Sequence, residues 1–187
     1  VAKHGNRAVS SKSGAADFYE NLGINIMASP EKTASLVDKT GFGFLMAPVY
    51  HAAMRFASPV RKALGIKTIM NILGPLLNPA GASYEVLGVY SKELLKDYGR
   101  AAKSLGAKRV LVVCSRDGYD EISPCAFTDG FIIDEKGNEK EIVIDPSQFG
   151  ITDAMEEELC GGSGEDNARL AMEIFEGGGR KTIRYAV

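Results

Sequence analysis

The 187-residue sequence is poor in the groups that mark disulfide-rich, zinc-binding or membrane-spanning proteins. Its three cysteines show no CxxC spacing, so we expect free thiols in a reducing compartment and no disulfide framework. It has only two histidines, and they form no cluster with cysteine of the kind that zinc requires. No stretch of about 18 consecutive apolar residues occurs, so the sequence predicts no membrane span.

An excess of charge of either sign is missing as well. The sequence has 22 basic and 24 acidic residues, with a formal net charge of −2. Such a chain has no overall positive field to attract nucleic acid or an anionic membrane surface. No secretory signal pattern is visible. We therefore expect a cytoplasmic protein that binds neither nucleic acid nor membrane.

The hydrophobic pattern that is present alternates between helix and strand. Residues 82–90 and 107–115 are apolar runs of strand length, and the helical pattern of residues 91–106 between them is amphipathic. Strand, helix and strand in this order form a βαβ unit. The sequence therefore predicts an α/β fold with a mostly parallel central sheet flanked by helices. We expect residues 1–187 to be a single domain that is cut at both ends.

Local signals predict the remaining elements. Ser13 is the expected N-cap of a helix over 11–23, whereas Ser29, Pro30 and Gly41 are the expected cap, first turn and end of a second helix. The other predictions are a strand over 42–48, a helix over 51–65 interrupted at Pro59, a buried turn over 67–81, a hairpin over 125–144, a helix within 161–179 and a strand over 181–187.

The opening stretch KHGNRAVSSKSG combines residue types that bind anions. Lys3, Arg7 and Lys12 supply positive charge, and its glycines allow backbone N–H groups to approach a ligand closely. The start of the following helix adds a partial positive charge. The stretch therefore predicts a phosphate or pyrophosphate site. The alternative is a basic, solvated loop that caps a helix.

The stretch SRDGYDEISP follows the buried strand RVLVVCS. In open α/β sheets, ligands bind beyond the carboxyl ends of the strands. Asp117, Asp120 and Glu121 place three carboxylates there within five positions. Because magnesium is typically held by one or two carboxylates together with substrate phosphates, this loop is a candidate Mg²⁺ site. The alternative is a solvated acidic turn.

Three stretches together carry a family resemblance: KHGNRAVSSKSGAAD, VRKALGIKTIMNILGPLLNPA and DGYDEIS. In this order they resemble anthranilate phosphoribosyltransferase, and the likeness runs over nearly the whole chain. The resemblance implies transfer of a phosphoribosyl group from 5-phosphoribosyl 1-diphosphate to anthranilate in tryptophan biosynthesis, with release of pyrophosphate. It also implies a need for Mg²⁺ and a homodimer for the full-length protein.

The resemblance implies three sets of site residues, each carried over by its motif. Ala15 stands where many members have a serine that contacts the diphosphate substrate. The implied set for 5-phosphoribosyl 1-diphosphate is Lys3, His4, Gly5, Asn6, Arg7, Ala8, Val9, Ser10, Ser11 and Ala15. The implied set for anthranilate is Asn6, Arg61, His4, Pro48 and His51, with Arg61 facing the carboxylate. The implied metal pair is Asp120 and Glu121.

Two departures leave other functions open. The family's glycine-rich GTGGD loop and its N-terminal helical domain have no counterpart in this sequence. The chain is therefore expected to be the large α/β domain, which by itself is either an active transferase or an inactive fragment that only binds a phosphorylated ligand. Pyrimidine nucleoside phosphorylases share the fold with a KHS-type motif. Here the motif is Lys3-His4-Gly5-Asn6, which favours the anthranilate branch.

Overall fold

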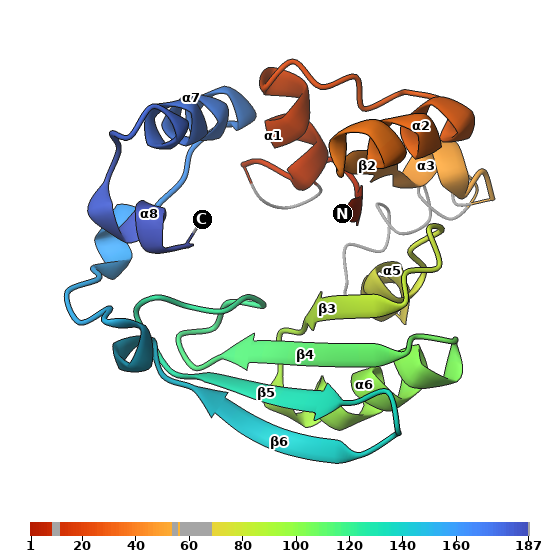
Figure 1. Cartoon of the computed structure of the whole chain (residues 1–187). Helices are drawn as coiled ribbons and strands as arrows, with labels where there is room; N and C mark the ends of the chain where they lie inside the picture. The colour runs from red at the N-terminus through yellow and green to blue at the C-terminus, as the bar shows by residue number, and fades with distance from the viewer. Residues whose placement is uncertain (9–11, 54–55, 57–68, 187) are drawn as a thin grey trace. The chain divides into compact units, whose positions relative to one another are not determined.

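The computed structural model describes residues 1–8, 12–53, 56 and 69–186 (Figure 1). The predicted site residues Val9, Ser10, Ser11 and Arg61 lie outside the described residues, as does most of the helix predicted over 51–65. The described residues form two compact units. Unit 1 comprises 1–80 and 161–177, and unit 2 comprises 81–160 and 178–187.

Unit 1 is built on a short parallel strand pair. Strand β1 pairs with β2 in the register Ala2 with Gly43 through Gly5 with Met46. Its core contains Ala16, Phe44 and Met46, all buried, with the ring of Tyr19 against Phe44. The elements of unit 1 are β1 (Ala2–Gly5), α1 (Ala15–Asn21), α2 (Pro30–Thr40), β2 (Gly43–Met46), α3 (Ala47–Tyr50), α5 (Ile69–Leu76) and α7 (Gly164–Phe175).

Unit 2 is a four-stranded sheet in the order β3-β4-β5-β6, with α6 packed against β4 and β5 (Figure 1). The β3–β4 pair is parallel, and β4–β5 and β5–β6 are antiparallel. The elements of unit 2 are β3 (Tyr84–Gly88), η1 (Lys92–Leu94), α6 (Leu95–Ser104), β4 (Arg109–Ser115), β5 (Thr128–Ile133), β6 (Glu139–Ile144), η2 (Pro146–Phe149), η3 (Glu156–Leu159) and α8 (Lys181–Ala186).

The predicted α/β class is confirmed, and so are the βαβ unit and the hairpin. Among the described residues, the expectation of a mostly parallel sheet is wrong for unit 2, because the hairpin adds two antiparallel pairs to the single parallel pair β3–β4; the other parallel pair is β1–β2 of unit 1. The turn between β5 and β6 is too short for the crossover that a parallel pair needs. The interpretation of residues 1–187 as a single domain stays a prediction.

Helix α2 shows its predicted ends. Ser29 accepts a hydrogen bond from the N–H of Lys32, Pro30 occupies the first turn, and Gly41 adopts a left-handed conformation with φ of 78°. These are the signals of a helix start and stop that the sequence carries locally.

Three local predictions are wrong. The N-cap of α1 is Gly14 and not Ser13, because the carboxylate of Asp17 accepts the N–H of Gly14 (2.9 Å). Residues 69–76, predicted as part of a buried turn, form helix α5 with Pro75 near its end. The last segment is helix α8 and not a strand, because the N–H of Thr182 donates to the Glu158 carboxylate (2.9 Å) in the first turn. Contacts outside the segment thus override a β-rich composition.

Candidate functional site

The first candidate region lies at the carboxyl ends of β1 and β2. Because the two strands are parallel, the chain leaves both at one edge: β1 leads into Asn6 and Arg7, and β2 into α3 with Pro48 at its exposed first turn. The rings of His4 and His51 meet edge to face, with centroids 5.1 Å apart. The structure therefore brings together the predicted residues His4, Pro48 and His51 of two segments far apart in sequence.

The segment after α5 contacts the same region. The amide of Asn78 donates to the carbonyl of Ala2 (2.9 Å), and Nε2 of His51 is 3.0 Å from the carbonyl of Leu77. His4 bonds to the backbone at Gly74. The motif that sequence analysis treated as a buried turn therefore supports both histidines.

His4 has the most distinctive environment in this region. Burial, and then the nearby His51, lower the pKa of His4 below its ordinary value of 6.5, so the ring is neutral near pH 7. Its Nε2 atom is buried and has no hydrogen-bond partner among the described residues. A buried polar atom without a partner costs free energy, so this nitrogen is an unsatisfied group at the candidate site.

Arg7 and Asp17 organise the loop that follows β1. The guanidinium of Arg7 pairs with Asp17 (2.9 Å) and with both carboxylate oxygens of Glu20 (2.7 and 2.8 Å). The other oxygen of Asp17 accepts the N–H groups of Ala8 and Gly14, each at 2.9 Å. These backbone bonds lower the pKa of Asp17. The charge of Arg7 is thus paired within its own unit by two carboxylates.

Three small residues, Gly5, Gly14 and Ala15, allow the chain to pack closely here. A Cβ atom on Gly14 would lie 2.4 Å from the backbone nitrogen of Ala8, so only glycine fits between the two ends of the loop. Ala15 begins α1, and a Cβ atom on Gly5 would lie 3.3 Å from its methyl group. The predicted ligand residues Gly5 and Ala15 are therefore neighbours.

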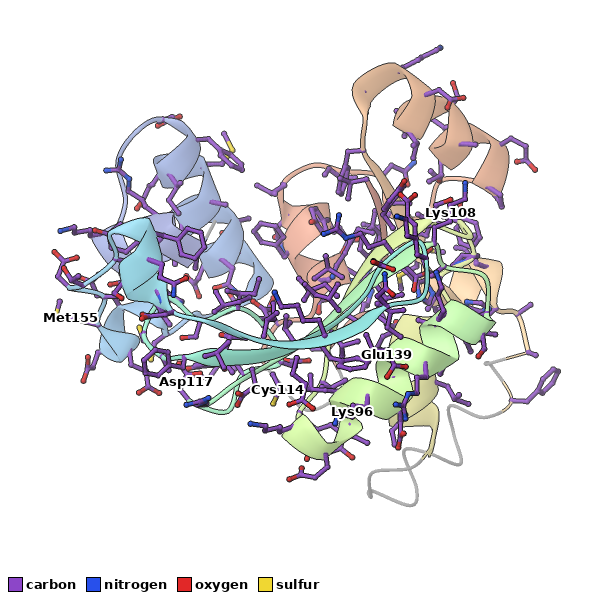
Figure 2. The ribbon with its side chains drawn as sticks, turned by 60° about the horizontal axis from the view of Figure 1, so that its bottom comes forward. Lys96, Lys108, Cys114, Asp117, Glu139 and Met155 are labelled. Atoms are coloured by element: carbon purple, nitrogen blue, oxygen red, sulfur yellow. The ribbon has the colours of Figure 1, made fainter. Side chains whose placement is uncertain are left out.

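The second candidate region is the acidic loop after β4, within unit 2. Asp117 lies just beyond the carboxyl end of the strand, at the opposite end from Lys108 (Figure 2). Its two carboxylate oxygens accept hydrogen bonds from the hydroxyls of Ser115 and Ser123. Asp120 and Glu121 are exposed, and their side chains form no hydrogen bond or ion pair with the rest of the described chain. Of the three predicted carboxylates, Asp117 is therefore bonded within the loop. Asp120 and Glu121 form an open pair, exposed and without a side-chain partner in the described chain.

The donor set suits magnesium. Asp120 and Glu121 offer hard oxygen ligands on adjacent residues, and across the described ranges no group of three or more metal-ligating side chains gathers anywhere. Magnesium needs only one or two carboxylates when substrate phosphates and water complete its octahedron. The pair therefore fits a metal ion that is shared with a phosphorylated substrate.

A buried carboxylate stands beside this loop. Asp129 on β5 is 7% exposed and accepts two hydrogen bonds from Arg116 (2.8 and 3.0 Å), with Lys92 at 3.1 Å. Arg116, together with Lys92, lowers the pKa of Asp129 to about 2 against the opposing effect of burial. The guanidinium of Arg116 is also 5.4 Å from the ring centroid of Phe127. The residue before Asp117 is thereby held against β5.

Sequence patterns did not predict the supporting roles of Asp17, Ser115 and Ser123. For Asp17 a signal existed, since a carboxylate three residues after an N-cap is the pattern of a capping box. The two serines carry no such local pattern, because they meet Asp117 only through the conformation of the loop.

The comparisons with known proteins match this arrangement. The sequence model of the "Glycosyl transferase family, a/b domain" matches residues 1–187. The chain belongs to this family. It is 48% identical to the anthranilate phosphoribosyltransferase of Lachnoclostridium phytofermentans and 46% identical to that of Ruminiclostridium cellulolyticum, over 95% of this chain and 52% of each relative. The chain thus spans about half the length of the curated relatives it matches.

Solved structures in this family agree with the fold. Anthranilate phosphoribosyltransferase from Thermus thermophilus matches with a TM-score of 0.84 and 40% identity, over the whole of this chain and 54% of that one. The enzyme from Saccharomyces cerevisiae, in complex with PRPP and Mg, matches with a TM-score of 0.84 and 35% identity, over 92% of this chain and 47% of that one. The resemblance to anthranilate phosphoribosyltransferase is therefore confirmed.

Within residues 1–8, 12–53, 56 and 69–186, no helix is both long and apolar enough to span a membrane.

Proposed function

We propose that this chain transfers the phosphoribosyl group of 5-phosphoribosyl 1-diphosphate to anthranilate, releasing pyrophosphate, with Mg²⁺ as cofactor. The observation that carries the proposal is the open carboxylate pair Asp120 and Glu121 on a fixed loop, in a chain whose yeast neighbour was solved with PRPP and Mg. Cytoplasmic location, a role in tryptophan biosynthesis and a homodimer for the full-length protein belong to the same proposal.

The chain's own residues divide into two tasks. Strand β1 and the loop after it offer Lys3 and the implied contacts Val9, Ser10 and Ser11 to the phosphoribosyl diphosphate. His4 and His51, with Pro48 nearby, offer a partly apolar surface to anthranilate, and the implied partner of its carboxylate is Arg61. Asn6 follows β1 directly and is implied in both contacts.

Positioning and leaving-group stabilisation suffice for the reaction. The C1–O bond to pyrophosphate breaks, the C1–N bond to the anthranilate amine forms, and the nitrogen then loses one proton. The amine is neutral at pH 7 and needs no strong base to attack. When bound between Asp120, Glu121 and the substrate phosphates, Mg²⁺ supplies stabilisation of the negative charge on the departing pyrophosphate.

Fluorescence of anthranilate tests the proposal directly. Purified chain is mixed with 5-phosphoribosyl 1-diphosphate, Mg²⁺ and anthranilate, and consumption is followed beside the double variant Asp120→Asn, Glu121→Gln. We expect consumption by the natural chain and a loss of about 100-fold or more in the variant, since the charge stabilisation is removed. Equal activity of the two proteins contradicts the metal role of the pair.

The two other functions have their own outcomes. Phosphorolysis of thymidine or uridine without anthranilate identifies a nucleoside phosphorylase. Binding of 5-phosphoribosyl 1-diphosphate by calorimetry, with no consumption of anthranilate, replaces the transferase function by that of a ligand-binding segment.

A further inference from the structure

The acidic loop is closed by hydrogen bonds that do not involve its candidate metal pair. At its start, the N–H of Ser115 donates to the carbonyl of Tyr119 (2.9 Å), and the N–H of Tyr119 donates back to the hydroxyl of Ser115 (3.0 Å). At its end, the hydroxyl of Ser123 accepts the N–H groups of Cys125 (3.0 Å) and Ala126 (3.2 Å). Each serine is only 4% exposed.

These acceptor roles decide where the hydrogen of Ser123 points. A hydroxyl has two lone pairs and one hydrogen. Backbone N–H groups occupy both lone pairs of Ser123, so this hydroxyl can form one further bond only by donating its hydrogen. It donates that hydrogen to Asp117. The hydroxyl of Ser115 lies within hydrogen-bond distance of the other oxygen of Asp117 and of the carbonyl of Tyr119 (2.9 Å). Asp117 therefore joins the two ends of the loop through one side chain.

Two strands fix the rest of the loop. On one side, the N–H of Ser123 donates to the hydroxyl of Thr128 (3.1 Å), a fully buried residue at the start of β5. On the other, a Cβ atom on Gly88 would lie 1.7 Å from the carbonyl oxygen of Asp120, so the backbone of Asp120 rests directly on the end of β3. The open pair is thereby held by β3, β4 and β5 together.

We propose that Asp117 is a positioning residue: by accepting hydrogen bonds from Ser115 and Ser123, it holds Asp120 and Glu121 in place for a metal ion without binding the metal itself. The inference rests on the proposed function, in which Asp120 and Glu121 are the metal pair. Residues that orient metal ligands typically change metal affinity by about 10- to 100-fold when they are replaced.

Two substitutions of Asp117 separate positioning from metal binding. Asp117→Ala removes both acceptors. Asp117→Asn keeps two hydrogen bonds, one of them reversed: its oxygen accepts from Ser123, and its amide donates to Ser115, whose hydrogen then turns to the Tyr119 carbonyl at 2.9 Å. A positioning role therefore tolerates Asn, whereas a role that depends on the negative charge does not.

The hairpin turn provides a matched control. Asp134 also closes a loop with its carboxylate, accepting the N–H groups of Lys136 (2.9 Å) and Asn138 (2.8 Å), but it lies at the other end of β5. Asp134→Ala therefore removes a comparable set of bonds far along the strand from Asp120 and Glu121.

The experiment combines metal binding with amide hydrogen exchange. Mn²⁺ binding in the presence of 5-phosphoribosyl 1-diphosphate is measured by electron paramagnetic resonance, and exchange is measured without metal. We expect Asp117→Ala to weaken Mn²⁺ binding about 10-fold or more and to speed exchange over residues 119–122, with Asp117→Asn within about threefold of the natural chain. Asp134→Ala should change exchange only at its own turn.

Two results overturn the inference: unchanged Mn²⁺ binding in Asp117→Ala, or an equal loss in Asp117→Asn, which would make the residue a charge partner of the metal. If Asp117→Ala does not fold, Ser115→Ala is used instead, because it removes one of the two donors to Asp117. It must weaken Mn²⁺ binding and speed exchange over residues 119–122 by smaller amounts. The double variant Asp120→Asn, Glu121→Gln separates the two proposals. Undiminished Mn²⁺ binding there refutes the metal pair, while the exchange data still report whether Asp117 orders the loop.

Discussion

The two candidate ligand loops are closed by the same device in different surroundings. In the loop that follows β1, which we call the basic loop, Asp17 accepts two backbone N–H groups and pairs with Arg7. The Asp17 side chain is 24% exposed. In the acidic loop, Asp117 accepts two serine hydroxyls that are themselves buried. Both carboxylates hold together segments that present other residues to a ligand.

The difference between the loops is where the support comes from. The basic loop is tied to the helix that immediately follows it, so its closure is local. The acidic loop is tied to strands β3 and β5, which come from other parts of unit 2. Because a buried network with every partner in place loses more when one member is removed, damage to the acidic loop should cost more than damage to the basic one.

The largest effect is expected from Gly88→Ala. The new methyl group would meet the backbone carbonyl of Asp120 at 1.7 Å, so the loop or the end of β3 must move. Overpacking of this kind costs about 1–3 kcal/mol, and we expect Mn²⁺ binding to weaken at least as much as in Asp117→Ala. Urea unfolding and metal titration measure the two effects. The control is Gly74→Ala on α5, where a Cβ atom meets nothing within 4 Å and stability should be kept.

Normal Mn²⁺ binding and stability in Gly88→Ala would show that the acidic loop is not held by β3. The contrast between local and distant support would then fail.

Asp129→Asn sharpens the comparison by removing the charge that anchors Arg116 beside the acidic loop. The pKa of Asp129 is lowered to about 2, so its ionised form stabilises the fold above the ordinary value of 3.8, and this stability is lost as the pH falls toward 2. We expect the variant to lose about 2 kcal/mol at pH 7, measured by urea unfolding. The loss should shrink between pH 4 and pH 2. A pH-independent difference contradicts the ionic explanation.

Asp17→Ala should have the smallest effect. It removes a carboxylate that acts as a helix cap and closes the basic loop, for which about 1 kcal/mol is typical. Urea unfolding measures the loss, and Asp38→Ala on the exposed face of α2 is the control, expected within about 0.5 kcal/mol of the natural chain. A loss in Asp17→Ala that exceeds the loss in Gly88→Ala reverses the ranking of the two loops.

Local signals predicted much of this structure, and distant contacts explain what they missed. Ser29, Pro30 and Gly41 fix the ends of α2 by bonds within a few residues, so the sequence predicts them well. Helix α8 depends on Glu158, more than twenty residues away, and its β-rich sequence alone indicates a strand. The candidate site divides in the same way: Asp120 and Glu121 follow a buried strand and were predicted, whereas Gly88 matters only because of a loop that arrives from β4.

The discontinuity of unit 1 has a consequence for the order of assembly. Helix α7 packs on α1, where Gly164 lies so close to the backbone of Asp17 that a Cβ atom would be 2.9 Å from its carbonyl oxygen. During synthesis, all of residues 81–160 leave the ribosome before α7 exists. Bringing α7 back to α1 closes this long loop, which is entropically costly and slow. The four-stranded sheet can form before α7 is added. We therefore expect the acidic loop to be ordered in the nascent chain while the helix layer beside the basic loop is still incomplete.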